Sequence, residues 1–398
     1  MRRPPQSDRR AERAGRKPDR AGPKSQRKPE RRPERRPERP QDRKPDRTTE
    51  TSPRVPVPRG APLPGTWIWA TRPGAETDLS EELELALGGG RARALAVGLV
   101  RSEGAPTFDD GSIDATFARQ GFVLDAELQA AGGSLVLPVL DAIGRMDPKR
   151  AFGLSSYTAD SDEGNRLSGQ AHELERAVRA GLLERDRRPA AIERLRDVDG
   201  TLVNVVVLSA DRALVGRVSA LLALSLHAGG RARMRVDSGG PSRAARKVEE
   251  ALAWLGVAPG PGELCIDLGA APGGWSWSLL ERRARVIAVD PAALRPDVAR
   301  HRGMRHEKVS AFQYAPPEPA DWLFCDMAWR PAEVAQALAK WGRRGWARIL
   351  VANLKLPMKR KAETVRELRE IVAGGGWKRV RTRQLYHDRD EITLTAYR

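Results

Sequence analysis

The chain has 398 residues, of which 40% are hydrophobic, and a net charge of +18, which is enough material for about two or three folded domains. It contains no run of about 18 apolar residues, and charged residues stand where a secretion signal has its apolar stretch, so neither a membrane span nor secretion is indicated. Its only cysteines, Cys265 and Cys325, lie in apolar runs, which disfavours disulfide and zinc sites. We therefore expect a cytoplasmic protein with no membrane partner and no metal.

Residues 1–60 differ in composition from the rest of the chain. They contain 21 basic residues, 9 acidic residues and twelve prolines, with almost no apolar residues. Such a segment cannot bury a core, so we predict a disordered basic tail. Two interpretations stay open: a polycation that raises the affinity for RNA phosphates, or a solubilising extension.

Residues 65–145 are predicted to form a small N-terminal α/β module. The patterns indicate strands at Trp67–Ala70 and Ala94–Leu99 with a helix at Leu79–Leu87 between them. The segment Phe117–Val123 joins aromatic residues to an arginine and a glutamine. It fits either an RNA contact or a buried strand edge.

Residues 150–230 are predicted to form a second module. The polar segment 147–165 indicates a loop or linker, and Gln170–Leu183 has a helical pattern. The β-rich runs Leu202–Leu208 and Leu214–Ser219 indicate a hairpin. Neither N-terminal module contains a cluster of potential catalytic groups, so we interpret them as a binding region for substrate, with a structural lid as the alternative.

Residues 235–398 show strands that alternate with helices, the pattern of a doubly wound parallel sheet. The helices are predicted at residues 242–255, Trp275–Leu280, Pro331–Trp341 and Ala362–Val372, and the strands at Leu264–Leu268, Arg285–Asp290, Trp322–Asp326, Ile349–Asn353 and Glu391–Tyr397. The predicted fold class is thus α/β.

The segment Leu264–Trp275 is an apolar strand that ends in an acid and opens into a glycine-rich turn. Gly269 and Gly273 remove side chains that would keep a ligand from the backbone, and a helix N-terminus follows. The turn lacks the Gly-Lys-Ser/Thr ending of a phosphate loop, and Ala271 replaces the middle glycine of the dinucleotide fingerprint. It resembles instead the cofactor turn of class I S-adenosylmethionine methyltransferases.

Several polar residues stand where predicted strands end: Asp267, Asp290, Asp326 and Lys355. Ligands of open α/β sheets lie outside the carboxyl ends of the strands, so we expect these side chains to converge. If the last strand is antiparallel, its first residue, Glu391, joins them.

Six motifs carry a resemblance to one family: Pro241–Arg243 with Lys247 and Glu249–Ala251, Asp267–Trp275, Cys325–Met327, Asn353–Lys359, Arg383–Glu391 and Phe117–Gln120. Together they closely resemble the ribosomal RNA large subunit methyltransferase M family, over about residues 65–398. The resemblance implies S-adenosylmethionine-dependent 2'-O-methylation of a cytidine in 23S ribosomal RNA. It also implies a class I methyltransferase Rossmann-like sheet in 235–398, preceded by a THUMP-like RNA-binding domain in 150–230.

The resemblance further implies a catalytic tetrad of Lys247, Asp326, Lys355 and Glu391. A ribose 2'-hydroxyl is a poor nucleophile until a base removes or shares its proton, and a lysine can be that base only when neutral. A neighbouring cation and partial desolvation lower the pKa of a lysine. We therefore predict Lys355 as the base and Lys247 as the neighbouring cation, with the two acids orienting the amines.

For the cofactor S-adenosylmethionine, the resemblance implies a set of contacts that includes Ser310, which replaces an acid of the family. The predicted cofactor residues are Ser242, Asp267, Gly269, Ala271, Pro272, Gly273, Gly274, Trp275, Asp290, Ser310 and Asp326. The expected partner is 23S ribosomal RNA or a large-subunit precursor, bound by a monomer. Two alternatives remain: a 2'-O-methyltransferase of another RNA site, and a non-catalytic RNA-binding or ribosome assembly factor.

Overall fold

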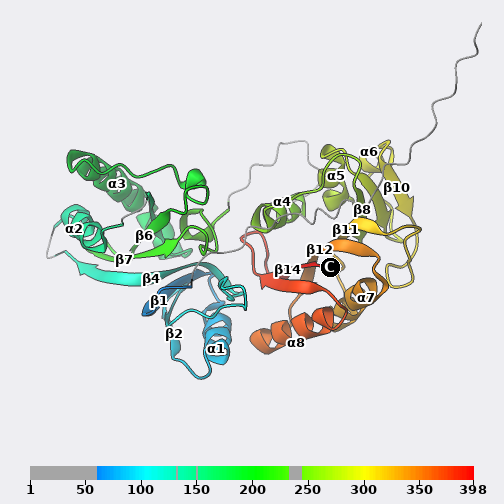
Figure 1. Cartoon of the computed structure of the whole chain (residues 1–398), viewed down its shortest axis with the longest axis horizontal. Coiled ribbons are helices and arrows are strands. Elements are labelled where there is room, and N and C mark those ends of the chain that lie inside the picture. The colour runs from blue at the N-terminus through cyan, green and yellow to red at the C-terminus, as the bar shows by residue number, and fades with distance from the viewer. Residues whose placement is uncertain (1–60, 131–132, 149–150, 233–243) are drawn as a thin grey trace, which may run out of the picture. The chain divides into compact units, whose positions relative to one another are not determined.

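The computed structural model of the protein shows two seven-stranded sheets with helices packed on them (Figure 1), which confirms the predicted α/β class. The predicted basic tail and the predicted cofactor contact of Ser242 lie outside the part of the chain that the structure describes. The described residues are 61–130, 133–148, 151–232 and 244–398.

The first sheet is built from the N-terminal region. Its strands are β1 (Thr66–Thr71), β2 (Ala92–Ala96), β3 (Leu99–Glu103), β4 (Ala118–Gln129), β5 (Phe152–Thr158), β6 (Thr201–Val207) and β7 (Arg212–Ser219). They lie in the order β2-β3-β1-β4-β7-β6-β5, and only β5 and β6 pair in parallel. The predicted hairpin is confirmed as β6 and β7. The sheet contains strands from both predicted N-terminal modules, whose division near residues 145–150 stays a prediction.

The helices of this region are α1 (Glu76–Ala86), α2 (Val136–Met146) and α3 (Asp162–Glu184), with short 3-10 turns η1 (Ile192–Arg194) and η2 (Ala228–Gly230). Apolar residues of α2 and α3, such as Ile143 and Val178, pack against inward-facing valines of β6 and β7. The predicted loop at 147–165 is wrong, because β5 and the start of α3 lie there. The hydroxyl of Ser161 accepts a hydrogen bond from the Gly164 amide at 3.0 Å and caps α3.

The second sheet has the predicted alternation of strands and helices. Its elements are α4 (Ala244–Leu255), β8 (Leu264–Leu268), α5 (Gly274–Glu281), β9 (Arg285–Val289), α6 (Pro296–Ala299), β10 (Met304–Glu307), β11 (Ala320–Cys325), α7 (Pro331–Arg344), β12 (Ala347–Lys355), α8 (Lys361–Ala373), β13 (Lys378–Arg383) and β14 (Glu391–Tyr397). The strand order is β10-β9-β8-β11-β12-β14-β13, in which β14 runs antiparallel to both of its neighbours. The condition under which Glu391 joins the other polar residues, an antiparallel last strand, is therefore met.

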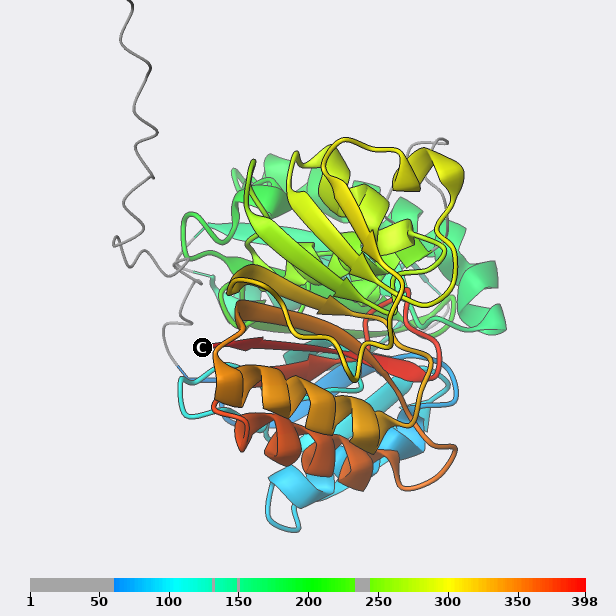
Figure 2. The same ribbon diagram turned by 90° about the vertical axis from the view of Figure 1, so that its right-hand side faces the viewer.

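Helices cover both faces of this sheet because its central strands are apolar on both sides. Val248 and Leu252 of α4 pack with Leu279 of α5 on the face that holds Cys265 and Phe324. The opposite face packs against α7 and α8, which lie side by side in Figure 2. This arrangement leaves the carboxyl ends of the parallel strands for a ligand site.

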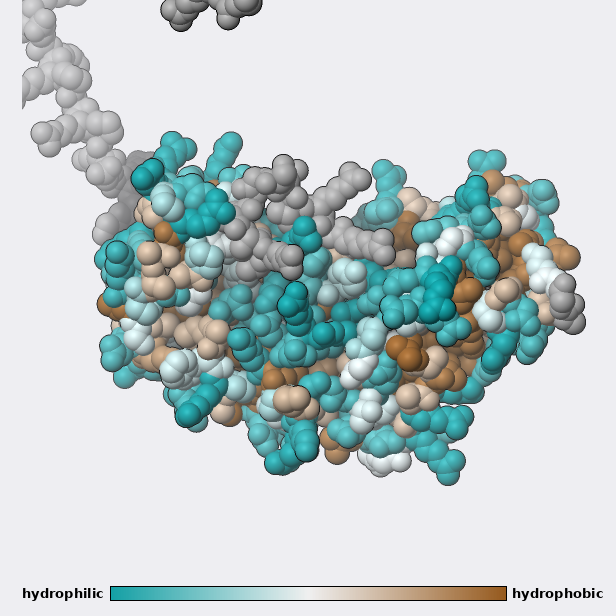
Figure 3. Space-filling view, turned by 180° about the vertical axis from the view of Figure 1, so that it is seen from behind, coloured by the Kyte–Doolittle hydropathy of each residue, from teal (hydrophilic) through white to brown (hydrophobic). Residues whose placement is uncertain are grey.

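Charged pairs connect the two regions of the chain. Both guanidinium Nη atoms of Arg369 on α8 lie 3.0 Å from the carboxylate of Asp114, and Lys361 lies 2.7 Å from Asp78 of α1. In the described ranges, no helix has the length and apolar character to span a membrane. The face shown in Figure 3 is largely hydrophilic, with hydrophobic residues in smaller groups.

Candidate active site

The carboxyl ends of β8 and β11 meet at the centre of the second sheet. The Asp326 amide donates to the Leu268 carbonyl at 3.1 Å, which holds the residues after both strands together. A Cβ atom added to Gly269 would lie 2.8 Å from Cγ of Met327. Gly269 also has a φ of +75°, so both its backbone conformation and the close approach of Met327 require glycine.

Lys247 and Glu391 form an ion pair between α4 and the start of β14, with side chains only 18% and 16% exposed. Lys355 stands directly opposite Glu391 in the register of β12 and β14. Asp326 follows β11 and interacts electrostatically with Lys247, Lys355 and Glu391. The structure thus brings together the four residues predicted as a tetrad, from four separate elements.

The charges of this cluster act on each other. Burial opposes the charged form of Lys247, but the negative charges of Asp326 and Glu391 outweigh it and raise the pKa of Lys247 above its ordinary value. Burial also raises the pKa of Asp326, although the two lysine charges oppose this rise. Lys247 is therefore held as a cation.

Lys355 differs from Lys247 in its surroundings. It is exposed, and it forms no side-chain hydrogen bond or ion pair with any residue in the described part of the chain. The protein by itself therefore does not desolvate this amine. Any desolvation of this amine has to come from a ligand that covers the end of β12.

The glycine-rich turn packs against the end of β9. The Ala271 amide donates to Oδ2 of Asp290 at 3.0 Å, and the Ala292 amide donates to Oδ1 at 2.8 Å. The Ala271–Pro272 peptide bond is cis. Gly273 has a φ of +110°, and a Cβ atom there would lie 3.0 Å from the side chain of Val298. Asp290 therefore lies at the end of β9, as the sequence predicted. It also holds the glycine-rich turn through these two hydrogen bonds.

Asp267 is fully buried at the end of β8. Its Oδ2 accepts a hydrogen bond from the Ser276 hydroxyl at 2.6 Å, whereas its Oδ1 has no partner among the described residues. Burial raises the pKa of Asp267 to about 7, and the charges of Asp326 and Asp290 add to the rise. Three acids therefore converge at adjacent strand ends, and this local negative charge favours a cationic ligand.

Two other predicted cofactor residues lie differently. Trp275 is 2% exposed, and its ring packs edge-on against Phe324 in the core, 6.1 Å between centroids. The carbonyl of Ser310 accepts hydrogen bonds from Gln313 and Tyr314, 3.0 and 3.1 Å away. No hydrogen bond or ion pair within the described ranges joins Ser310 to the three acids.

Sequence reasoning missed two residues that support the site. Buried Glu250, one turn after Lys247 on α4, accepts hydrogen bonds from the Tyr386 amide at 2.7 Å, and from the His387 amide and Nδ1 at 3.0 and 2.7 Å. Buried Asp388 accepts from the Leu385 amide at 3.0 Å, and burial raises its pKa to about 8. Both hold the loop that leads to Glu391. The i, i+3 spacing of Lys247 and Glu250 places both on one face of α4 but does not indicate the partners of Glu250.

The chain is similar in sequence to known methyltransferases. Residues 241–356 match the family model of the FtsJ-like methyltransferases. Ribosomal RNA large subunit methyltransferase M of Xylella fastidiosa (strain M12) is 37% identical over 292 residues, which are 70% of this chain and 80% of the relative. The protein of the same name from Alkalilimnicola ehrlichii is 34% identical over 361 residues, 83% and 94% of the two chains. The one from Laribacter hongkongensis is 33% identical over 349 residues, 82% and 95%.

Proposed function

The chain belongs to the ribosomal RNA large subunit methyltransferase M family, and we propose that it methylates the 2'-hydroxyl of a cytidine in 23S ribosomal RNA. That it is an FtsJ-like ribosomal RNA methyltransferase follows from the family. We propose three further points: that the target is a cytidine, that the methyl group goes to its 2'-oxygen, and that the four residues have the roles given below. The observation that carries the proposal is the Lys247–Glu391 ion pair with Asp326 and Lys355 beside it.

S-adenosylmethionine supplies a methyl group already activated by the sulfonium charge. The residues around the glycine-rich turn fit such a ligand, because Asp267, Asp290 and Asp326 converge there and one oxygen of Asp267 is buried without a partner among the described residues. We assign Asp290 to the ribose hydroxyls of the cofactor, since both of its oxygens keep a second lone pair beyond the Ala271 and Ala292 amides.

The two lysines have different proposed roles. Lys247 is the permanent cation, since Asp326 and Glu391 raise its pKa. Lys355 is the base: its amine takes the proton of the 2'-hydroxyl when the RNA covers it and excludes water. Bound S-adenosylmethionine would supply the methyl group that the 2'-oxygen accepts and would leave as the neutral thioether.

The proposed function predicts that the full chain transfers labelled methyl from S-adenosylmethionine to 23S RNA isolated from cells that lack the protein. A 2'-O-methyl group blocks alkaline cleavage of the adjacent phosphodiester bond, because the attacking hydroxyl is lost. We therefore expect the label in an alkali-resistant dinucleotide that begins with cytidine. Label recovered in an ordinary mononucleotide would place the methyl on a base and contradict the proposal.

The cofactor turn is tested by Gly273→Val. The new side chain meets Val298 and occupies a backbone conformation that L-residues avoid, so we expect the turn to lose its shape and S-adenosylmethionine binding to be abolished in calorimetric titration. Gly262→Val is the matched control, because Gly262 has a similar φ of +80° with nothing near its Cβ position. Each variant carries about 1–2 kcal/mol of backbone strain. If both variants bind S-adenosylmethionine with equal affinity, the cofactor does not bind at this turn.

A further inference from the structure

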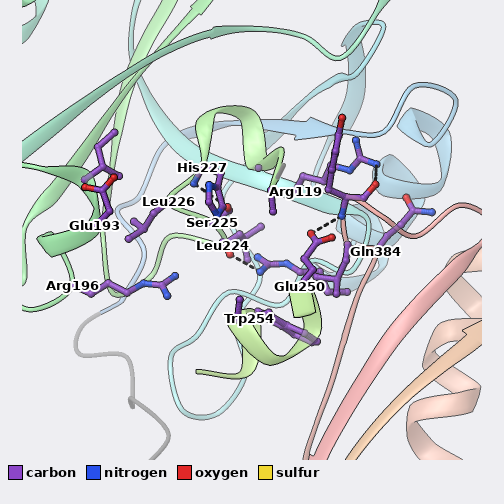
Figure 4. Close-up of a pocket in the computed structure, with 17 residues that line it drawn as sticks. Arg119, Glu193, Arg196, Leu224, Ser225, Leu226, His227, Glu250, Trp254 and Gln384 are labelled. Carbon is purple, nitrogen blue, oxygen red and sulfur yellow. Dashed lines mark hydrogen bonds between the residues drawn. The ribbon is translucent and has the colours of Figure 1, made fainter. Parts of the chain in front are cut away.

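A cavity of about 250 Å³ lies along α4, beyond the tetrad (Figure 4). Its walls come from β4, the residues after η1, the loop after β7, α4 and the loop after β13. In the close-up, Trp254 and Glu250 project from α4, and Arg196 reaches toward the cavity from the opposite side. None of the four tetrad residues lines it.

Two arginines of the wall lack a carboxylate partner. Arg383 is 6% exposed; its Nη1 donates to the Leu224 carbonyl at 2.5 Å, and its Nη2 is buried without a partner among the described residues. Arg196 donates to the carbonyls of Ala220 and Ala223 at 3.2 and 3.1 Å. Neither guanidinium forms an ion pair within the part of the chain that the structure describes.

Two of the nearby carboxylates have other partners. Glu250 binds the Tyr386 and His387 amides and the imidazole of His387. Asp160 pairs with Arg119, whose Nη1 lies 2.8 Å away. Three arginines, Arg119, Arg196 and Arg383, line the cavity together with two glutamates, Glu193 and Glu250, so its wall carries more positive than negative side chains.

A buried guanidinium such as that of Arg383 is unfavourable unless an anion pairs with it. Burial and the positive charge of Arg196 together lower the pKa of Arg383 to about 9. The guanidinium carbon of Arg383 also lies 5.5 Å from the ring centroid of Trp254. Guanidinium donors next to an aromatic face are the features with which proteins bind the phosphates and bases of single-stranded RNA.

The position of the cavity fits an RNA strand that continues from the tetrad. Lys247, Glu250 and Trp254 lie on one face of α4, and Trp254 is about 10 Å along the helix from Lys247. We propose that the cavity binds a phosphodiester group of the substrate RNA a few nucleotides from the methylated ribose, with Arg196 and Arg383 as donors and Trp254 as a stacking surface. This inference rests on the proposed function for the identity of the RNA.

Arg196→Gln tests the proposal, because Arg196 is exposed and its removal leaves the buried Arg383 in place. Arg194→Gln is the matched control, an exposed arginine two residues away that does not line the cavity. With 23S RNA as the probe, we expect Arg196→Gln to bind about tenfold more weakly. The slope of log affinity against log salt concentration should become shallower by about 0.7–1, whereas Arg194→Gln should match the wild type in both.

Ethylation interference on the same RNA locates the contact. We expect one ethylated phosphate near the methylated cytidine to weaken binding of the wild type but not of Arg196→Gln. If Arg196→Gln keeps the wild-type slope and interference pattern while the wild type methylates the RNA, the cavity proposal is wrong and the proposed function stands. If the wild type transfers no methyl group, the proposed function is wrong, and the binding data still decide whether the cavity holds an RNA phosphate.

Discussion

Lys355→Met is expected to lower the single-turnover rate of methyl transfer about 10²–10⁴-fold, the usual cost of losing a general base. Since Lys355 is exposed and forms no ion pair with a described residue, its loss should leave the fold and the affinity for S-adenosylmethionine nearly unchanged. Lys359→Met, a change of the same kind at an exposed lysine in the loop that follows β12, is the control.

The outcome separates three roles of Lys355. Transfer at the wild-type rate in Lys355→Met would remove Lys355 as the base. Loss of cofactor binding, measured by calorimetric titration, would reassign the residue to the cofactor site. Weaker RNA binding with an unchanged rate at saturating RNA would make it a contact to the RNA.

Lys247→Met should be nearly as damaging at neutral pH, for a different reason. Without the cation of Lys247, the negative charges of Asp326 and Glu391 act on Lys355 alone and raise its pKa. A lysine with a raised pKa stays protonated to higher pH, so the rate of this variant should be low at pH 7 and recover as the pH rises. Lys355→Met should not recover.

Single-turnover transfer of labelled methyl across a pH series checks this difference, with thermal unfolding of each variant followed in parallel. The Lys247→Met variant leaves Asp326 and Glu391 partly buried without their partner, so some loss of stability is expected. A flat pH profile for a folded Lys247→Met protein would show that Lys247 does more than control the protonation of Lys355.

The sequence was most informative where strands are central and apolar. The strands β8, β9, β11 and β12 were predicted because their runs are hydrophobic on both faces, and the site residues followed from where these runs end. The convergence of Asp326, Lys355 and Glu391 then depended only on strand direction, which the antiparallel β14 satisfies.

Three of the missed strands, β5, β10 and β13, are edge strands of their sheets. Edge strands pair on one side only and carry polar or charged residues that discourage further pairing, as in the sequences of β10 (MRHE) and β13 (KRVRTR). The predicted strand at Ala94–Leu99 spans the turn between β2 and β3, where Gly98 has a φ of +76°. Such polar and turn residues give no alternating pattern to recognise.

The contacts that hold the loop before Glu391 could not be predicted from the sequence either. Nothing in the spacing indicates that Glu250 binds the amides of Tyr386 and His387, which follow it by more than 130 residues. The same holds for Arg196, which follows η1, and Arg383, which ends β13, although both line one cavity. Contacts of this kind depend on tertiary packing and leave no local signal.

The most direct test of the central claim is a map of 2'-O-methylated nucleotides in 23S RNA from cells with the protein, without it, and with Lys355→Met in its place. We expect one methylated cytidine to be present in the first cells and absent from the other two, with every other site unchanged. An identical map in all three would contradict the claim that this chain methylates 23S RNA at a ribose.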